Sequence, residues 1–240
     1  SFDESTSKVT FLATGSEGNA VIAAKDQDGT ILWSWHIWMT DQPAEQKYIN
    51  SFGTFTMLDR NLGAVSTTAG DRDAYGLCYQ WGRKDPFVIN GYMLTAPDNA
   101  IVYQYKDPAN DNISQAIKNP CVVYNDANWG YDTNLWSSNK TMYDPCPPGY
   151  CVPVYEDILA IKMSGLEIDL PKAGAIWYDL DPSGLKMLSR AGFYWTSSLS
   201  EGSRSRSIDF YVYEDKTGLK SEYCNASGFS IRPQKINNKQ

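Results

Sequence analysis

Tyr143-Asp-Pro-Cys-Pro-Pro-Gly-Tyr-Cys-Val-Pro153 is the stretch that most restricts how the surrounding chain can fold. Its four prolines each fix φ at about −65° and remove a backbone donor, which excludes a helix or a central strand. Gly149 supplies the backbone freedom that a sharp reversal needs. We call residues 143–153 the proline-rich segment, and we expect it to be stiff and irregular.

An amphipathic helix is predicted directly after this segment, over residues 154–164. Two acids, Glu156 and Asp157, fall in its first turn, where they complement the helix dipole. Its apolar face consists of Val154, Ile158 and Ile161, widened by Leu159 and Met163. A second short helix is predicted over Ile113–Lys118.

The composition is that of a folded globular protein, with 42% hydrophobic and 20% charged residues. The formal net charge of −7 argues against nucleic-acid partners and anionic membrane surfaces, which both require basic patches. No apolar run approaches the roughly 18 residues that would span a bilayer, so we expect no membrane insertion. The 16 tyrosines and 8 tryptophans favour a β-rich core, an aromatic stacking surface, or both.

Most of the remaining chain predicts strands. Residues 19–24 and 30–39 form a hairpin across Asp26-Gln-Asp-Gly29, and the second strand is apolar on both faces, so we expect it to be central. Thr40–Tyr48 is expected to be a polar connection, Ala74–Trp81 a short helix or buried strand, and Gly82–Phe87 a turn in which Arg83, Lys84 and Asp85 pair locally. Other strands are predicted at 8–13, 52–58, 175–178, 192–198, 207–213 and 228–233.

Several blocks occur in an order that resembles a known family. The blocks are Trp33-Ser-Trp-His-Ile-Trp38, Leu58-Asp-Arg-Asn-Leu-Gly-Ala64, Tyr79-Gln-Trp-Gly-Arg-Lys-Asp-Pro-Phe87, the proline-rich segment, Tyr194-Trp-Thr-Ser-Ser198 and Gly228-Phe-Ser-Ile-Arg232. Together they resemble the Fibrobacter major paralogous domain family, common in surface lipoproteins and fimbrillin-associated proteins of Bacteroidetes-type bacteria, over about residues 19–235.

The resemblance implies an α+β, C-type-lectin-like fold with antiparallel strands, one or two short helices and long irregular loops. We expect one domain over residues 1–240, with 1–18 and 236–240 peripheral. We also expect an exported protein on the bacterial outer surface, lipid-anchored through a leader or upstream domain removed before Ser1. Fold alone does not fix function, so these functional expectations are analogies.

The chain departs from the family pattern at its cysteines. The family often closes on a cysteine that bridges back to the proline-rich segment, and Pro233 occupies that position here. A Cys146–Cys151 bridge and a Cys146–Cys224 bridge are the alternatives, while Cys78 and Cys121 are expected to be free. The calcium-binding triplets of C-type lectins are absent from the sequence, so we do not expect calcium-dependent sugar chelation of the C-type-lectin kind. We expect no metal site and no cofactor.

An enzyme is not favoured. The single histidine, His36, lies within an aromatic strand and is expected to be a bonded structural residue. Asp126, Asp132 and Asp144 are candidate carboxylates for glycoside hydrolysis, but among 28 acids such pairs arise by chance. The clusters Asp71-Arg-Asp73 and Asp107–Asn112 lack the calcium-loop spacing, so we interpret them as turns.

The region from Gly91 to Asn139 shows little periodicity, which is typical of functional loops. Within it, flat aromatic rings alternate with side chains that bond sugar hydroxyls: Trp129, Tyr131, Asp126, Asn128 and Asp132. The alternative is that Trp129 and Trp136 fill the core beneath a loop. The sequence therefore predicts a non-enzymatic surface adhesion module that binds a glycan or a surface protein. The competing hypothesis is a fimbrial tip or assembly subunit that binds other surface proteins through an exposed edge strand.

Overall fold

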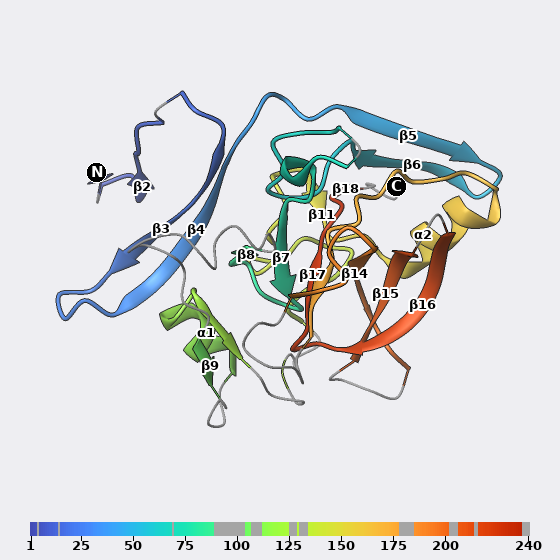
Figure 1. Cartoon of the computed structure of the whole chain (residues 1–240). Helices are drawn as coiled ribbons and strands as arrows, with labels where there is room; N and C mark the ends of the chain where they lie inside the picture. Colours follow the sequence, from blue (N-terminus) through green and yellow to red (C-terminus); the bar gives the residue numbers. More distant parts are fainter. Residues whose placement is uncertain are drawn as a thin grey trace.

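The computed structural model describes residues 1–3, 5–13, 15–68, 70–88, 104–106, 112–124, 129, 134–177, 185–201, 206–213 and 216–236. Within them the fold is β-rich, with mostly antiparallel strand pairs and two α-helices, as expected of an α+β protein (Figure 1). The helices are α1 (Asn112–Lys118) and α2 (Tyr155–Met163), and a 3-10 helix covers Arg72–Ala74. Both predicted helices are therefore confirmed, and none of the helices described is long and apolar enough to cross a membrane.

The largest sheet contains most of the strands of the C-terminal half. Its strands are β7 (Leu77–Gln80), β8 (Phe87–Val88), β12 (Ala175–Ile176), β13 (Leu185–Lys186), β14 (Ala191–Leu199), β15 (Arg206–Tyr213), β16 (Lys216–Cys224) and β17 (Gly228–Ser230). Strand β17 joins its halves, since it pairs antiparallel with β7 and β12 and parallel with β14 through Tyr194 and Ser230.

A second sheet of four strands brings the chain's C-terminal part beside its N-terminal third. It consists of β5 (Glu45–Asn50), β6 (Gly53–Leu58), β11 (Tyr150–Cys151) and β18 (Gln234–Lys235), in the order β11-β18-β6-β5. The expectation of a polar connection over Thr40–Tyr48 was wrong in its second half, because β5 pairs with β6 along its whole length.

Strand β14 separates the two main apolar clusters. Trp195 lies on one face of the strand and stacks on Phe229, with 4.2 Å between the ring centres. Tyr194 lies on the other face, stacked on Phe210 at 5.3 Å and packed with Ile158 and Ile161 of α2. Because both faces of β14 are covered, most of its first residues are apolar without alternation, over Ala191–Trp195. The apolar face of α2 is narrower than predicted, since Met163 is exposed.

The hairpin of β3 (Gly18–Lys25) and β4 (Ile31–Met39) has the predicted pairing, but the expected central position of residues 30–39 was wrong. Among the described residues β4 pairs only with β3, and the two strands extend away from the larger sheets (Figure 1). The face that meets the rest of the protein is anchored by Ser34, His36 and Trp38 through hydrogen bonds. Trp38 packs against a core cluster, but the hairpin as a whole lies at the protein's periphery and not between two core layers.

The remaining strands are short. β1 (Phe2–Asp3) pairs with β2 (Lys8–Val9), and β9 (Gln104–Lys106) pairs in parallel with β10 (Val122–Tyr124). The predicted strand over Lys8–Ala13 is thus realised in only its first two residues.

Candidate functional site

A groove of about 520 Å³ lies between β4 and the proline-rich segment. We call it the β4 groove. One wall is formed by residues 33–36 and Trp38 of β4, and the other by Met142 and residues 144–148 of the proline-rich segment. Its large side chains are Trp33, Trp35, Trp38, Met142, Pro145, Pro147 and Pro148. A pocket of this size, with mainly apolar walls, suits a few side chains of a ligand.

Among the described residues, the β4 wall is an unpaired strand edge. Residues of both faces of β4 line the groove and no residue of β3 does, so the groove follows the edge opposite β3. Within the described part of the chain, no backbone hydrogen bond joins β4 to any strand other than β3. Strand edges of this kind carry unpaired backbone donors and acceptors.

The hairpin is held firmly against the body. Ser34 Oγ donates to Asp85 Oδ1 at 2.6 Å, and Trp38 Nε1 donates to the Ala64 carbonyl at 2.9 Å. The Lys84 ammonium bonds Asp85 at 2.9 Å and lies 4.5 Å from the centre of the Trp33 ring. Burial lowers the pKa of Lys84, and the Asp85 carboxylate opposes that shift. One wall of the groove is therefore positioned in advance.

The opposite wall is organised around Asp144. Its Oδ1 accepts from the backbone N–H of Cys146 and its Oδ2 from that of Val152, each at 2.9 Å. Lys140 donates to the same carboxylate at 3.0 Å and to the Tyr150 carbonyl at 3.1 Å. This arrangement assigns Asp144 a structural role, because both oxygens hold the proline-rich segment in place.

The polar side chains that line the groove are already bonded. His36 lies between Asn19 at 2.9 Å and the Tyr79 hydroxyl at 3.1 Å, and burial lowers its pKa to about 4. The interpretation of His36 as a bonded structural residue is confirmed. Ser34, Lys84 and Asp144 are engaged as described above. The groove thus offers a ligand aromatic and proline surfaces and the backbone of β4, but few free side-chain hydrogen-bonding groups.

The structure places Trp129, the only predicted site residue it describes, in the core. Trp129 is 0% exposed, its Nε1 donates to the Trp81 carbonyl at 2.9 Å, and its ring stacks on Tyr124 at 5.3 Å. Its burial supports the packing interpretation, because no face of the ring is open to a sugar. Trp136 is likewise buried. Tyr131, Asp126, Asn128 and Asp132 lie outside the described residues.

The charged turn 82–87 is structural, as predicted. Arg83 is buried and donates to the carbonyls of Val122 at 2.5 Å and Pro120 at 2.9 Å, so its charge holds the chain around β10. Asp71 caps the 3-10 helix by accepting from the Asp73 N–H at 3.1 Å, which agrees with its interpretation as a turn residue.

All five cysteines are free in this structure, so neither of the two proposed bridges is formed. Cys78, Cys146, Cys151 and Cys224 are buried and Cys121 is exposed. Burial raises the pKa of Cys146 and brings that of Cys151 to about 12. Such thiols stay protonated and unreactive at neutral pH. Among the described residues, no group of three potential ligands could hold a metal ion.

The tryptophans of β4 were not predicted as site residues. Their alternation on both strand faces was interpreted as a sign of burial between two layers. The density of tryptophan was the available signal, because three of the chain's eight lie within residues 33–38. A search with protein-family models found no match to the chain, and searches of curated proteins and of solved structures found none either.

Proposed function

We propose that this chain is a non-enzymatic binding module that holds an extended segment of another protein along the free edge of β4. The observation that carries the proposal is the β4 groove, in which an unpaired strand edge lies opposite a wall of prolines. Prolines donate no backbone hydrogen bonds, so the prolines of this wall cannot pair with the edge of β4 as donors.

An extended peptide matches this groove better than a ligand that needs many polar side chains. A peptide strand bonds through its backbone and places alternate side chains in pockets on the two faces. Along the groove, Trp33 and Trp35 lie on one face of β4, and Trp38, whose Nε1 bonds the Ala64 carbonyl, lies on the other. Ser34, His36 and Lys84 already bond to protein groups, which leaves β4's backbone as the main source of polar contacts.

The proposal includes a place for this module on the outer surface of a bacterium, in adhesion or in assembly of surface proteins. That part is supported by the resemblance of the ordered sequence blocks. The same blocks support the finer assignment of the fold as C-type-lectin-like. The β-rich fold of the described residues, with its two short helices, is compatible with it.

A second candidate function is glycan binding at the same groove. It is favoured by Trp35, whose side chain is 38% exposed at the groove and offers an aromatic ring on which a sugar can stack. The predicted loop residues Tyr131, Asp126, Asn128 and Asp132 remain candidates for this function.

Selection from a library of random peptides displayed on phage, with the purified chain as bait, tests the primary proposal. Selected peptides should lose affinity by about tenfold or more for Trp35→Ala, because buried interface tryptophans are typical hot spots. Leu32→Ala is the matched control, since Leu32 is an exposed apolar residue of the same strand outside the groove.

Backbone pairing between the peptide and β4 can be tested separately, by N-methylation of the peptide. N-methylation of a selected peptide should abolish binding at alternate positions only, because alternate N–H groups of an added strand face β4. Uniform tolerance of N-methylation would rule out strand addition. A glycan array run with wild type and Trp35→Ala, with calcium and with chelator, tests the second candidate; glycan binding without peptide binding would replace the primary proposal.

A further inference from the structure

The N-terminal segment Lys8–Ala13 exposes an unusual amount of apolar surface. Phe11 is 51% exposed and Leu12 is 93% exposed, while Val9 is also open to solvent. Large apolar side chains this exposed and this close together are typical of interaction sites. The segment lies at the periphery of the molecule, next to β3 and β4 (Figure 1).

This segment has the sequence of a strand but only part of a strand's pairing. Lys8 and Val9 pair with β1, and Thr10 exchanges backbone hydrogen bonds with Ser1, each of 2.8 Å. For Phe11, Leu12 and Ala13, the described part of the chain provides no backbone partner. The part of the chain that the structure describes thus contains both an incompletely paired strand and a strand edge with no partner.

The segment Lys8–Ala13 and the part of β4 that lines the groove are also similar in length and in side-chain pattern. The segment has six residues, and five residues of β4 between Trp33 and Trp38 line the groove. In an extended strand Val9 and Phe11 point to one side and Leu12 to the other. Tryptophans lie on both faces of β4 along the groove, and the most open of them is Trp35, at 38% exposed.

The charge of Ser5–Ala13 makes it a better candidate occupant of the β4 groove than more acidic segments. Ser5–Ala13 contains Lys8 as its only charged residue, in a chain whose net charge is −7. Because it carries no carboxylate, the segment approaches an acidic copy of the same protein without local repulsion.

We propose that the occupant of the β4 groove is residues 8–13 of a second copy of this chain, which adds as a strand to β4. This inference rests on the proposed function, since it names the partner of the same groove. The donated segment and the accepting groove are different surfaces, so the contact is heterologous and can repeat from copy to copy. The expected product is an open chain of subunits that lengthens with concentration.

Two complementary variants test the inference. Phe11→Asp/Leu12→Asp removes the donor, and Trp35→Glu places a carboxylate in the acceptor. Sedimentation velocity should show that wild type assembles as concentration rises, that each variant alone stays monomeric, and that their mixture forms a one-to-one complex. The mixture assembles because one intact segment and one intact groove remain. Leu32→Asp, outside the groove, should assemble like wild type.

A peptide measurement keeps the test independent of the folding of Trp35→Glu. A labelled peptide of residues 7–14 should bind the Phe11→Asp/Leu12→Asp chain, and the affinity should fall about tenfold or more when Trp35→Ala is added. If library-selected peptides bind the groove and this peptide does not, the inference is overturned and the proposed function stands. If neither binds, both fail. Wild type that stays monomeric at every concentration, with no binding of the peptide, also overturns the inference.

Discussion

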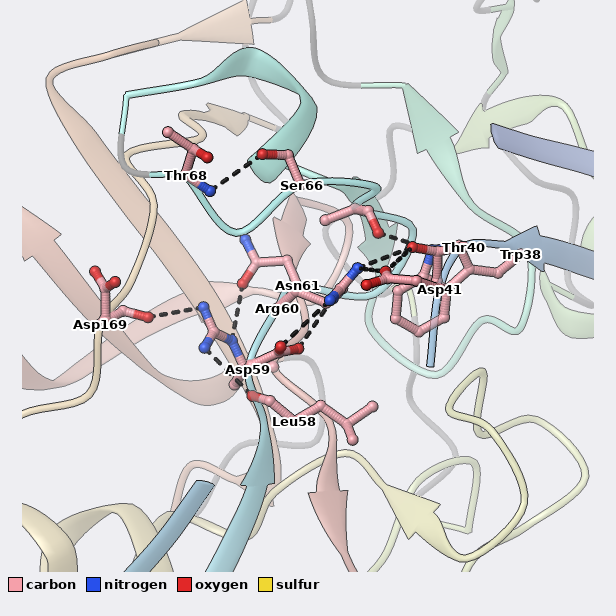
Figure 2. A network of polar contacts seen from close by, with 12 residues as sticks. Trp38, Thr40, Asp41, Leu58, Asp59, Arg60, Asn61, Ser66, Thr68 and Asp169 are labelled. Carbon is pink, nitrogen blue, oxygen red and sulfur yellow. Dashed lines mark hydrogen bonds and ion pairs between the residues drawn. The ribbon is translucent and has the colours of Figure 1, made fainter. Parts of the chain in front are cut away.

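Arg232 donates through Nε to Asn61 Oδ1 at 3.1 Å, a contact that joins positions 171 residues apart. The same guanidinium donates to the carbonyl of Asp169 at 2.7 Å and to that of Leu58 at 3.4 Å (Figure 2). Asn61 in turn donates to the Tyr75 carbonyl at 3.0 Å. One buried arginine thus ties the end of β6, the stretch after α2 and the stretch after β17 together.

Arg232→Met should destabilise the protein by about 3 kcal/mol or more, because its removal leaves buried acceptors without a donor. Urea unfolding followed by tryptophan fluorescence measures the change. Arg190→Met is the control, since Arg190 is an exposed arginine, and it should shift the midpoint little. Equal midpoints for the two variants would show that the Arg232 network contributes nothing to stability.

Asp144→Ala should cost about 2–4 kcal/mol of stability, since it leaves the N–H groups of Cys146 and Val152 without acceptors and removes the ion-pair partner of Lys140. Because these bonds hold one wall of the β4 groove, peptide affinity should fall as well. Thermal unfolding and a peptide titration measure the two effects. Asp28→Ala is the control, at an exposed acid in the β3–β4 turn. Unchanged stability would contradict the structural role given to Asp144.

Periodicity predicted where strands lie better than how they pair. β4 and β14 are both apolar on both faces, yet only β14 lies between two core clusters. The difference arises from pairing between distant segments, which a local pattern does not encode. β5 and β16 were missed because their sequences, Glu-Gln-Lys-Tyr-Ile-Asn and Lys-Thr-Gly-Leu-Lys-Ser-Glu-Tyr-Cys, are largely polar. Both are edge strands of their sheets. An edge strand bonds to one neighbour only and has an open outer side, so it tolerates polar sequences.

The same limit applies to the site. The proline-rich segment was predicted as a stiff element, and Asp144 shows how it is held. That it lies opposite β4, about a hundred residues earlier in the chain, depends on contacts such as the one between Trp33 and Tyr143 at 6.1 Å. Burial of Trp129 depends equally on contacts with Trp81 and Tyr124. An aromatic loop has the same composition whether its rings fill a core or face solvent.

Maleimide labelling of the native protein at neutral pH should modify one cysteine, Cys121. It is the one exposed thiol of the five, and the other four are buried. Partial burial raises the pKa of Cys121, so the reaction should be slower than that of a free thiol. Intact-mass spectrometry should find one label before denaturation and five after it, and none on Cys121→Ser before it. A native Cys146–Cys151 or Cys146–Cys224 bridge would reduce the count after denaturation to three.

Asp209 should make the protein less stable as the pH rises. Its carboxyl group is 0% exposed in β15, opposite Trp195, and neither oxygen has a hydrogen-bond partner in the described part of the chain. Burial therefore raises the pKa of Asp209 well above its usual range. The folded protein keeps this proton at pH values where the unfolded chain has lost it, so the folded state binds more protons.

Stability from this group is complete below about pH 4, the unfolded value, and falls at higher pH by up to about 1.4 kcal/mol per pH unit until Asp209 ionises in the folded protein. The side chain that Asp209→Asn introduces stays neutral at every pH, so the substitution should remove this slope. The free energy of unfolding of the variant should therefore exceed that of wild type by a margin that grows from pH 4 to pH 8. Urea unfolding across this range measures the slope, and Asp28→Asn, at an exposed acid, should follow the wild-type curve. Parallel curves for wild type and Asp209→Asn would mean that Asp209 is already solvated or paired in solution.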